Sequence, residues 1–312
     1  MFNSSIVSYG ESGRDSRYGS NRYRGNTDGG IVKDFLDYCE MKFKHPVHTC
    51  SDYMSGSFTT RDVCKERGID GVWTDLSQGF NMLRDDIPDR PESIFWHPPY
   101  SSMINIPYAG AEWDDKEFEQ KYGYDPKPYD LGRMDWDEFV KALSYCCIKQ
   151  YAALETGGRM GILMGDIRRK GQYRSMLLDI AKPGEVESLI IKAQRNTTSG
   201  NKQYGTRNFV PIEQEYFLIL KKALPYLLDF SYVSKKKLDI RDSKDTTWKD
   251  VVLAVLEALG REASLSSIYE EVDGHKKTES NPHWKEKVRQ TLQLLEKAGL
   301  AKPLERGVWA VA

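Results

Sequence analysis

Short apolar runs alternate with amphipathic stretches between Gly30 and Lys222, and this alternation restricts the fold more than any other feature of the chain. In the amphipathic stretches the apolar residues return with a helical period, whereas the apolar runs are short and bounded by glycine, proline or polar residues. Strands that alternate with helices in this way predict a sheet covered by helices on both faces. We therefore expect an α/β fold with a mostly parallel sheet.

The periodicity assigns the stretches to helices and strands. Helices are expected over residues 31–43, 59–68 and 136–158. Strands are expected over residues 45–54, 71–77, 91–100, 159–167, 186–194 and 213–222. The strand over 91–100 closes with a Pro-Pro pair, which cannot continue a ladder of backbone hydrogen bonds.

Composition divides the chain into four parts. Residues 1–28 are rich in Gly, Ser, Arg and Asn without any period, which predicts a flexible segment. The α/β domain is expected over residues 29–230 and a charged linker over 231–245. The remainder, residues 246–312, is typical of a winged helix-turn-helix. Its three helices and terminal hairpin are expected over residues 247–260, 264–272 and 283–299 and around Arg306-Gly307.

Several classes of protein are excluded by composition. The formal net charge is −1, so the average charge gives no reason to expect nucleic acid. No run of about 18 apolar residues predicts a membrane span, and the polar N-terminus lacks the apolar core of a signal peptide. The five cysteines have no CxxC spacing and the five histidines are scattered. Reduced thiols in a cytoplasm are therefore expected, and no metal site is predicted.

The neutral average hides two oppositely charged segments. Residues 84–138 carry six Lys/Arg against fourteen Asp/Glu, whereas residues 159–207 carry ten against four. The basic segment also contains Tyr173 and Gln194, side chains of the kind that contact phosphates and base edges. A solvated charged surface is the alternative explanation of the basic segment.

The sharpest local motif is an apolar strand that ends in His97, Pro98, Pro99 and Tyr100. In open α/β sheets ligands bind at the carboxyl ends of strands, which is where this motif is expected. The prolines fix the direction of the backbone carbonyls, and Tyr100 offers a face on which a planar ligand can stack. A turn that merely ends a strand is the alternative.

A second motif, Asp52 to Thr60, lies between the first strand and its helix. Its small residues let backbone amides approach a ligand, and the helix N-terminus that follows favours an anionic group. Asp75 comes about twenty residues later at the end of the second strand, where a carboxylate can accept both hydroxyls of a ribose. The loop lacks the GxGxxG spacing, and a tight turn with a helix cap is the alternative.

Together these motifs resemble the amino-group DNA methyltransferases, which use S-adenosylmethionine to methylate adenine N6 or cytosine N4. The segment DYMSGSFTT is similar to the family's D-P-x-x-G-S-G-T-T loop, and HPPY stands where the family has D/N/S-P-P-Y. The resemblance runs from about Tyr23 to Lys222 and implies a Rossmann-like methyltransferase fold. The chain departs from the family pattern at Tyr53, Phe58 and His97, although a subgroup of the family carries HPPY.

The resemblance implies roles for the motif residues. S-adenosylmethionine would be held by Asn26, Asp52, Met54, Gly56, Ser57, Thr59, Thr60 and Asp75. The catalytic residues would be His97, Pro98, Pro99 and Tyr100. A flipped base would stack on Tyr100 and donate hydrogen bonds from its amino group to His97 and the Pro98 carbonyl, with direct methyl transfer and no cysteine nucleophile. Only neutral imidazole accepts a hydrogen bond, so we expect methylation to fall as the pH drops through the pKa of His97.

Adenine N6 is the preferred target. An N4-cytosine enzyme and a catalytically silent DNA- or protein-binding relative are the alternatives, and RNA or protein methylation ranks lower. Double-stranded DNA is the expected partner, together with a restriction or defence protein, and oligomerisation is compatible with the sequence. We expect a cytoplasmic protein encoded by a bacterium, a phage or a mobile element.

Positively charged and amide side chains supply the predicted DNA contacts. These are Arg168, Arg169, Lys170, Lys192, Gln194, Arg195, Lys285 and Arg289. The C-terminal unit resembles winged helices of restriction-associated and chromatin-associated proteins, with a protein-interaction module as the alternative. The acidic insertion, residues 105–138, is expected to be a lid or a partner surface. Asp86 is a weaker candidate for the adenine end of the cofactor, and Asp166 a candidate site residue or helix cap.

Overall fold

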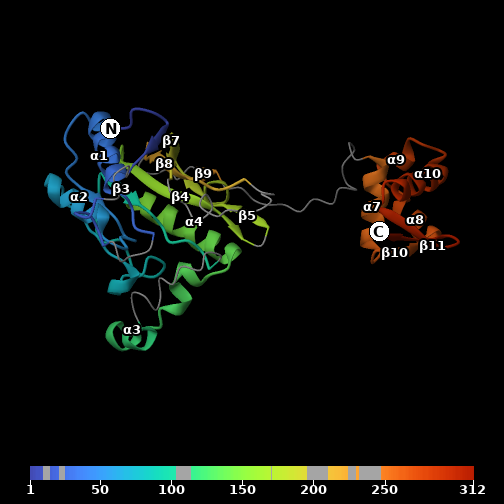
Figure 1. Ribbon diagram of the computed structural model, residues 1–312, viewed down its shortest axis with the longest axis horizontal. Helices are drawn as coiled ribbons and strands as arrows, with labels where there is room; N and C mark the ends of the chain where they lie inside the picture. Colours follow the sequence, from blue (N-terminus) through green and yellow to red (C-terminus); the bar gives the residue numbers. More distant parts are fainter. Residues whose placement is uncertain are drawn as a thin grey trace. The chain divides into compact units, whose positions relative to one another are not determined.

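The computed structural model describes residues 1–9, 15–20, 25–102, 114–169, 171–194, 210–223, 230–231 and 247–312. The chain divides into two compact units, Met1–Val233 and Ser234–Ala312, which are coloured from blue to yellow and from orange to red in Figure 1. No helix in the described part of the chain is long and apolar enough to cross a membrane.

Among the residues that the structure describes, the first unit is built on a seven-stranded sheet. Its strands are β1 (Ile6–Ser8), β2 (Cys50–Ser51), β3 (Ser93–Trp96), β4 (Arg159–Arg169), β5 (Gln172–Ser175), β7 (Glu185–Ala193) and β8 (Gln214–Lys221). The order is β1-β7-β8-β4-β3-β2, with β5 paired to β4. β2, β3 and β4 pair in parallel and β1 pairs in parallel with β7, while β8 runs antiparallel between β7 and β4. The predicted α/β fold with a mostly parallel sheet is confirmed.

Helices cover both faces of this sheet (Figure 1). α1 (Gly29–Phe43) and α2 (Thr59–Arg67) pack on one face, and α4 (Trp136–Ala153) and α5 (Met176–Asp179) pack on the other. α3 (Asp115–Tyr122) contributes to neither core and lies away from the sheet. Asp28 caps α1 by accepting from the Gly30 N–H, and Asp135 caps α4 by accepting from the Glu138 N–H. Such side-chain acceptors satisfy N–H groups that the first helical turn leaves unpaired. A small two-stranded sheet joins β6 (Lys182–Pro183) to β9 (Phe230–Ser231).

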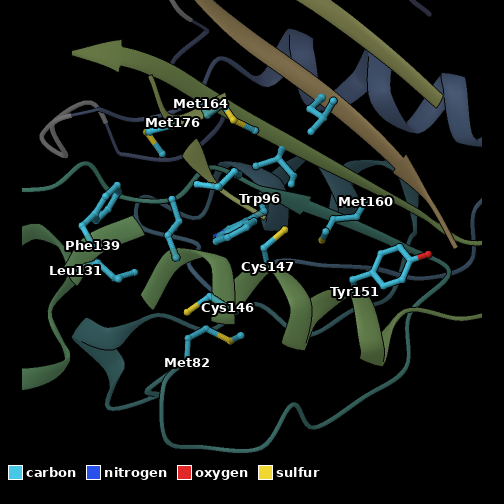
Figure 2. Close-up of a cluster of buried hydrophobic side chains, with 14 of the residues drawn as sticks. Met82, Trp96, Leu131, Phe139, Cys146, Cys147, Tyr151, Met160, Met164 and Met176 are labelled. Carbon is cyan, nitrogen blue, oxygen red and sulfur yellow. The ribbon is translucent and has the colours of Figure 1, made fainter. Parts of the chain in front are cut away.

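The alternation along the strands separates two cores. Ile94 and Trp96 of β3 belong to the cluster under α4, whereas Phe95 belongs to the cluster under α1 and α2. Figure 2 shows the α4-side cluster, in which Trp96 is surrounded by buried sulfur-containing and apolar side chains. Because successive side chains of a strand point to opposite faces, a continuous apolar run supplies both cores. The last residue of β3 is therefore held rigidly just before His97.

Two predictions for the first unit are wrong. Part of the segment expected to be flexible forms β1, which pairs with β7 from Ile6↔Ile191 to Ser8↔Ala193, and Tyr18 is buried in the α1-side core. A three-residue strand is too short to show a period, and its partner lies far along the chain. The strand expected over 71–77 is reduced to one isolated bridge, Asp52↔Trp73.

Over residues 247–312, the second unit has three main helices and a three-stranded sheet. Its helices are α7 (Trp248–Ala258), α8 (Leu265–Val272), the short α9 (Lys276–Glu279) and α10 (Trp284–Lys297). Its strands β10 (Glu262–Ser264), β11 (Ala301–Glu305) and β12 (Val308–Val311) pair in the order β10-β12-β11. A capping box between Thr247 and Asp250 starts α7, and a separate apolar core lies between the helices. This arrangement is the predicted winged helix-turn-helix.

Candidate functional site

A pocket opens at the carboxyl ends of β2 and β3. Its cavity has a volume of about 890 Å³, counting the part open to solvent. All the predicted cofactor residues line it: Asn26, Asp52, Met54, Gly56, Ser57, Thr59, Thr60 and Asp75. His97, Pro98 and Pro99 line it too. Residues taken from four separate segments of the sequence therefore meet at one cavity.

The loop after β2 is organised around the Asp52 side chain. One carboxylate oxygen accepts from the Thr60 hydroxyl at 2.7 Å, and the other accepts from the Met54 N–H at 3.1 Å. Burial raises the pKa of Asp52 to about 7, with a smaller contribution from the charge of Asp75. A cation bound in the pocket would stabilise the carboxylate and draw this pKa back down.

Phe58 occupies the left-handed region of backbone space, with φ of 64°. It immediately precedes α2, and its ring stacks under the Arg61 guanidinium at 4.5 Å from the ring centroid. The left-handed conformation costs a residue with a Cβ roughly 1–2 kcal/mol relative to glycine. Phe58 therefore adopts a backbone conformation that glycine favours, at the position where the resembled loop has a glycine.

Asp75 is hydrogen-bonded to the loop that follows β2. One of its carboxylate oxygens accepts from the Gly56 N–H at 3.0 Å, and the other accepts from the Ser77 N–H and hydroxyl at 3.0 and 2.7 Å. The short 3-10 turn Leu76–Gln78 begins at this cap. Asp75 is buried at the pocket wall. Its hydrogen bonds fix the orientation of the carboxylate before a ligand binds.

His97 lies beside the segment that precedes α1. Its Nδ1 is 2.8 Å from the Thr27 hydroxyl oxygen, and Thr27 also lines the pocket. Its Nε2 is buried, has no hydrogen-bond partner among the described residues, and lies 3.9 Å from Oε1 of Glu215. Burial lowers the pKa of His97, an effect that Glu215 opposes and Lys192 reinforces. A neutral imidazole is favoured.

Tyr100 does not line the pocket. Its ring lies edge-on to His97, and its hydroxyl donates to Oε1 of Glu215 at 3.3 Å. The stacking of a base on Tyr100 therefore stays a prediction.

Lys192 and Gln194, two of the predicted DNA contacts, are half-buried and lie beside Glu215. Their contact with DNA stays a prediction. The Lys192 ammonium donates to Oε2 of Glu215 at 2.6 Å with only 13% of its side chain exposed, and Gln194 donates a further side-chain hydrogen bond to Glu215. Counting charges along a sequence does not reveal which side of a strand a lysine is on. Thr27 and Glu215, which surround His97, were missed because no local motif marks them.

The other candidates divide between exposed and buried positions. Arg168 and Arg169 are exposed at the end of β4, where Arg168 lies over the Tyr173 ring and Arg169 donates to the Ser102 carbonyl. Lys170 and Arg195 lie outside the described residues. Asp86 is exposed and does not line the pocket. Asp166 lies within β4 and accepts from the hydroxyls of Tyr173 and Tyr216, so it is not a helix cap.

The described part of the acidic insertion reaches the pocket. Tyr129, Asp130 and Leu131 line it, and Asp130 accepts from the Gly132 N–H and from Arg133. The Tyr124 hydroxyl donates to the Gly79 carbonyl at 3.0 Å, which anchors the insertion to the loop beside Asp75. Its role as a lid or a partner surface stays a prediction.

Possible metal ligands gather away from this pocket. His45, His48 and Glu92 place their ligand atoms within 4.8 Å of one another, and Glu92 accepts from the His48 N–H at 2.8 Å. These residues precede β2 and β3, at the opposite ends of the strands from the pocket. The prediction of no metal site did not foresee this group.

In the second unit, Lys285 and Arg289 are exposed on α10. Arg289 pairs with Glu286 at 3.0 Å, and the Lys285 ammonium lies over the rings of Tyr269 and Trp284. Both positive charges thus remain accessible on the surface of this helix. Their contact with DNA stays a prediction.

Comparison with known proteins identifies the second unit most directly. Residues 244–310 match the DpnI_C family, described as the Dam-replacing HTH domain. No curated protein sequence matches the chain significantly.

Similar solved structures include an S-adenosylmethionine-bound amino pentose methyltransferase from Micromonospora echinaspora. The identity is 10% and the TM-score 0.26, over 48% of this chain and 62% of that one. TrmN from Thermus thermophilus is 13% identical with a TM-score of 0.31, over 64% and 50% of the chains. A putative DNA modification methylase, also from Thermus thermophilus, is 13% identical with a TM-score of 0.26, over 68% and 75%.

The chain spans less than two thirds of the first two of these structures. At such identities and TM-scores the likeness does not decide what this chain acts on. The family match does cover the second unit almost completely, so the predicted helix-turn-helix is confirmed as one similar to the Dam-replacing HTH domain.

Proposed function

We propose that the chain is a DNA methyltransferase that transfers a methyl group from S-adenosylmethionine to an exocyclic amino group, with adenine N6 preferred over cytosine N4. One observation carries the proposal: the cofactor-loop residues, Asp75 and the His97-Pro98-Pro99 turn all line a single pocket. The helix-turn-helix in the same chain supports DNA as the substrate.

The pocket suits the proposed cofactor in charge. Its wall carries three buried carboxylates, Asp52, Asp75 and Asp130. The pKa of Asp52 is raised to about 7 because of burial. A ligand with ammonium and sulfonium charges would stabilise the ionised form of Asp52. S-adenosylmethionine carries both charges, a ribose for Asp75 to bind, and the methyl group that is transferred.

The protein's own residues would position the target base. The Pro98 carbonyl and a nitrogen of His97 are the proposed acceptors for the amino group, and direct transfer needs no cysteine nucleophile. Consistent with this, each of the five cysteines is buried, and none lines the pocket. Phe58 gives little support to a catalytically silent protein, because it takes the backbone path that glycine would take.

Binding followed by product analysis tests the proposal. Calorimetry with S-adenosylmethionine should show binding that Asp75→Asn weakens strongly and that Asp70→Asn, an exposed control outside the pocket, leaves unchanged. The protein should then methylate mixed duplex DNA, and digestion with mass analysis should identify N6-methyladenine.

The other outcomes of this test are equally informative. N4-methylcytosine would establish the alternative target. Cofactor binding without product on DNA would indicate a silent relative, and no binding at all would overturn the cofactor assignment.

A further inference from the structure

Four neighbouring strands place one row of residues across the carboxyl end of the sheet. His97 directly follows β3, Gly165 lies on β4, Glu215 on β8 and Lys192 on β7. Gly165 pairs with Glu215, and Glu215 pairs with Lys192, in the registers of the antiparallel ladders. Residues that are directly opposite in neighbouring strands have side chains on the same face. The row therefore connects the pocket to a buried ion pair.

Because Gly165 has no side chain, there is room beside it for the Tyr100 hydroxyl. A Cβ at this position would lie 2.5 Å from the Tyr100 hydroxyl oxygen, closer than any van der Waals contact allows. With no side chain there, the Tyr100 hydroxyl reaches Glu215, and Glu215 comes within 3.9 Å of Nε2 of His97.

The charges of the row are balanced. Glu215 and Lys192 are 9% and 13% exposed and form an ion pair at 2.6 Å. Burial by itself raises the pKa of Glu215, but Lys192 and His97, with hydrogen bonds from Lys192 and Gln194, lower it overall. Lys192 thus keeps Glu215 ionised beside His97. Because the ion pair is neutral as a whole, a neutral His97 completes a row without net charge.

The groups that face the two ring nitrogens of His97 indicate where its proton resides. A neutral imidazole has one N–H, and the other nitrogen accepts. The carboxylate of Glu215 faces Nε2 and favours the proton there, even at 3.9 Å, while Nδ1 faces the Thr27 hydroxyl at the pocket wall. Catalytic hydrogen bonds are often long before substrate binds and shorten in the complex.

We propose that Glu215 is a positioning residue, which holds the proton of His97 on Nε2 and so leaves Nδ1 as the acceptor for the target amino group. This inference rests on the proposed function. The Thr27 hydroxyl donates to Nδ1 in the free protein, and the amino group of the flipped base takes its place. The carboxylate orients the imidazole as the acidic member of a hydrolase triad does, without becoming protonated itself.

The row also accounts for the proton that the reaction releases. The amino nitrogen uses its lone pair to form the bond to the methyl carbon, and the S–C bond breaks with its electron pair left on sulfur. The nitrogen, now positively charged, loses one proton to Nδ1, and the N–H electron pair returns to nitrogen as its lone pair. The resulting imidazolium is stabilised by Glu215 and later releases the proton to solvent. Thr27, Tyr100, Glu215 and Lys192 are the polar groups that the structure places around this ring.

Nuclear magnetic resonance of histidine nitrogens tests the tautomer without relying on activity. In protein labelled with ¹⁵N-histidine at pH 8, the His97 signals, assigned by their loss in His97→Asn, should show Nε2 protonated and Nδ1 bare. In Glu215→Gln the population should move toward Nδ1–H. If Glu215→Gln does not fold because Lys192 is left buried without its partner, the double variant Lys192→Met/Glu215→Gln removes both charges and should show the same change. A wild-type protein with the proton on Nδ1, or variants with an unchanged tautomer, would overturn the proposal.

Kinetics test the link to methyl transfer. Glu215→Gln should lower kcat by about tenfold or more, as loss of a residue that orients a functional histidine does, and should move the acid limb of the kcat profile to lower pH. Glu185→Gln is the matched control, since Glu185 pairs with Lys221 between the same two strands at the far end of the sheet. Glu185→Gln should leave the limb in place.

A double-mutant cycle separates positioning from support of the fold. In a His97→Asn background, Glu215→Gln should have no further effect on kcat, because no imidazole remains to be oriented. An equal loss in both backgrounds would overturn the proposal. Absence of methylation by the wild type would instead count against the proposed function, while the tautomer measurement would still decide the role of Glu215.

Discussion

Replacing Asp52 by asparagine should make the free protein more stable at pH 8 while it abolishes cofactor binding. The pKa of Asp52 is raised from 3.8 to about 7 because of burial, so the ionised form disfavours the folded state above that pH. A shift of roughly three units corresponds to about 4 kcal/mol at about 1.36 kcal/mol per unit. One of the hydrogen bonds from Met54 and Thr60 is lost in the amide, which removes about 1 kcal/mol.

The size of this effect changes with pH in a defined way. As the pH falls through 7, Asp52 takes up its proton in the folded state before it does so in the unfolded chain, so the wild type gains stability relative to the variant. The expected advantage of Asp52→Asn is about 3 kcal/mol at pH 8 and less than about 1 kcal/mol at pH 5. Urea unfolding of the first unit at the two pH values measures both numbers.

Two results would refute this reasoning. A variant less stable than the wild type at pH 8 would mean that the buried carboxylate is not disfavoured. An advantage of equal size at pH 5 and pH 8 would mean that the gain has another origin than ionisation. Calorimetry with S-adenosylmethionine on the same preparations should show that the more stable variant has lost its ligand, the exchange of stability for function that active sites display.

Three further predictions concern other parts of the molecule. With saturating cofactor, methyl transfer should fall on the acid side of pH 6.5, because burial lowers the pKa of His97 from 6.5 and the imidazolium cannot accept a hydrogen bond; His97→Asn should lack this fall, and a rate unchanged from about pH 4.5 to 8 would contradict it. Gly165→Ala should destabilise the first unit by about 1–3 kcal/mol, since its Cβ meets the Tyr100 hydroxyl; urea unfolding should show a smaller loss in a Tyr100→Phe background, and an equal loss would place the clash elsewhere. Lys285→Ala/Arg289→Ala should reduce the slope of log affinity against log salt for DNA by about 2 if both contact phosphates; an unchanged slope would favour a protein-interaction module.

Local patterns predicted the elements that carry the pocket. The periods of α1 and α4 and the apolar run of β3 are complete within each segment, so no knowledge of distant partners was needed. His97 was expected at the carboxyl end of a strand, where ligands bind in open α/β sheets. The grouping of Asp52, Asp75 and His97 in one site came from the family resemblance. The pocket lining agrees with that grouping.

The parts that the sequence did not reveal depend on pairing between distant strands. Glu215 meets His97 only because β8 inserts beside β4 in one particular register, and no motif near Glu215 indicates that register. Lys192 looked like a surface cation because charge counting is blind to the side of a strand on which a residue lies. β1 was missed for a similar reason, since three residues acquire strand structure only from their pairing with β7.

The place of β8 in the sheet sets the order in which this unit can be completed. It is the last of the seven strands along the chain, yet it lies between β7 and β4 and, among the described strands, links β1 and β7 to β4, β3 and β2. During synthesis the two parts of the sheet stay separate until residues 214–221 have left the ribosome. The strand that closes the sheet also brings Glu215 to His97, so a chain stopped before it has neither a continuous sheet nor an oriented imidazole. Insertion of β8 therefore completes the sheet and orients His97 in the same step.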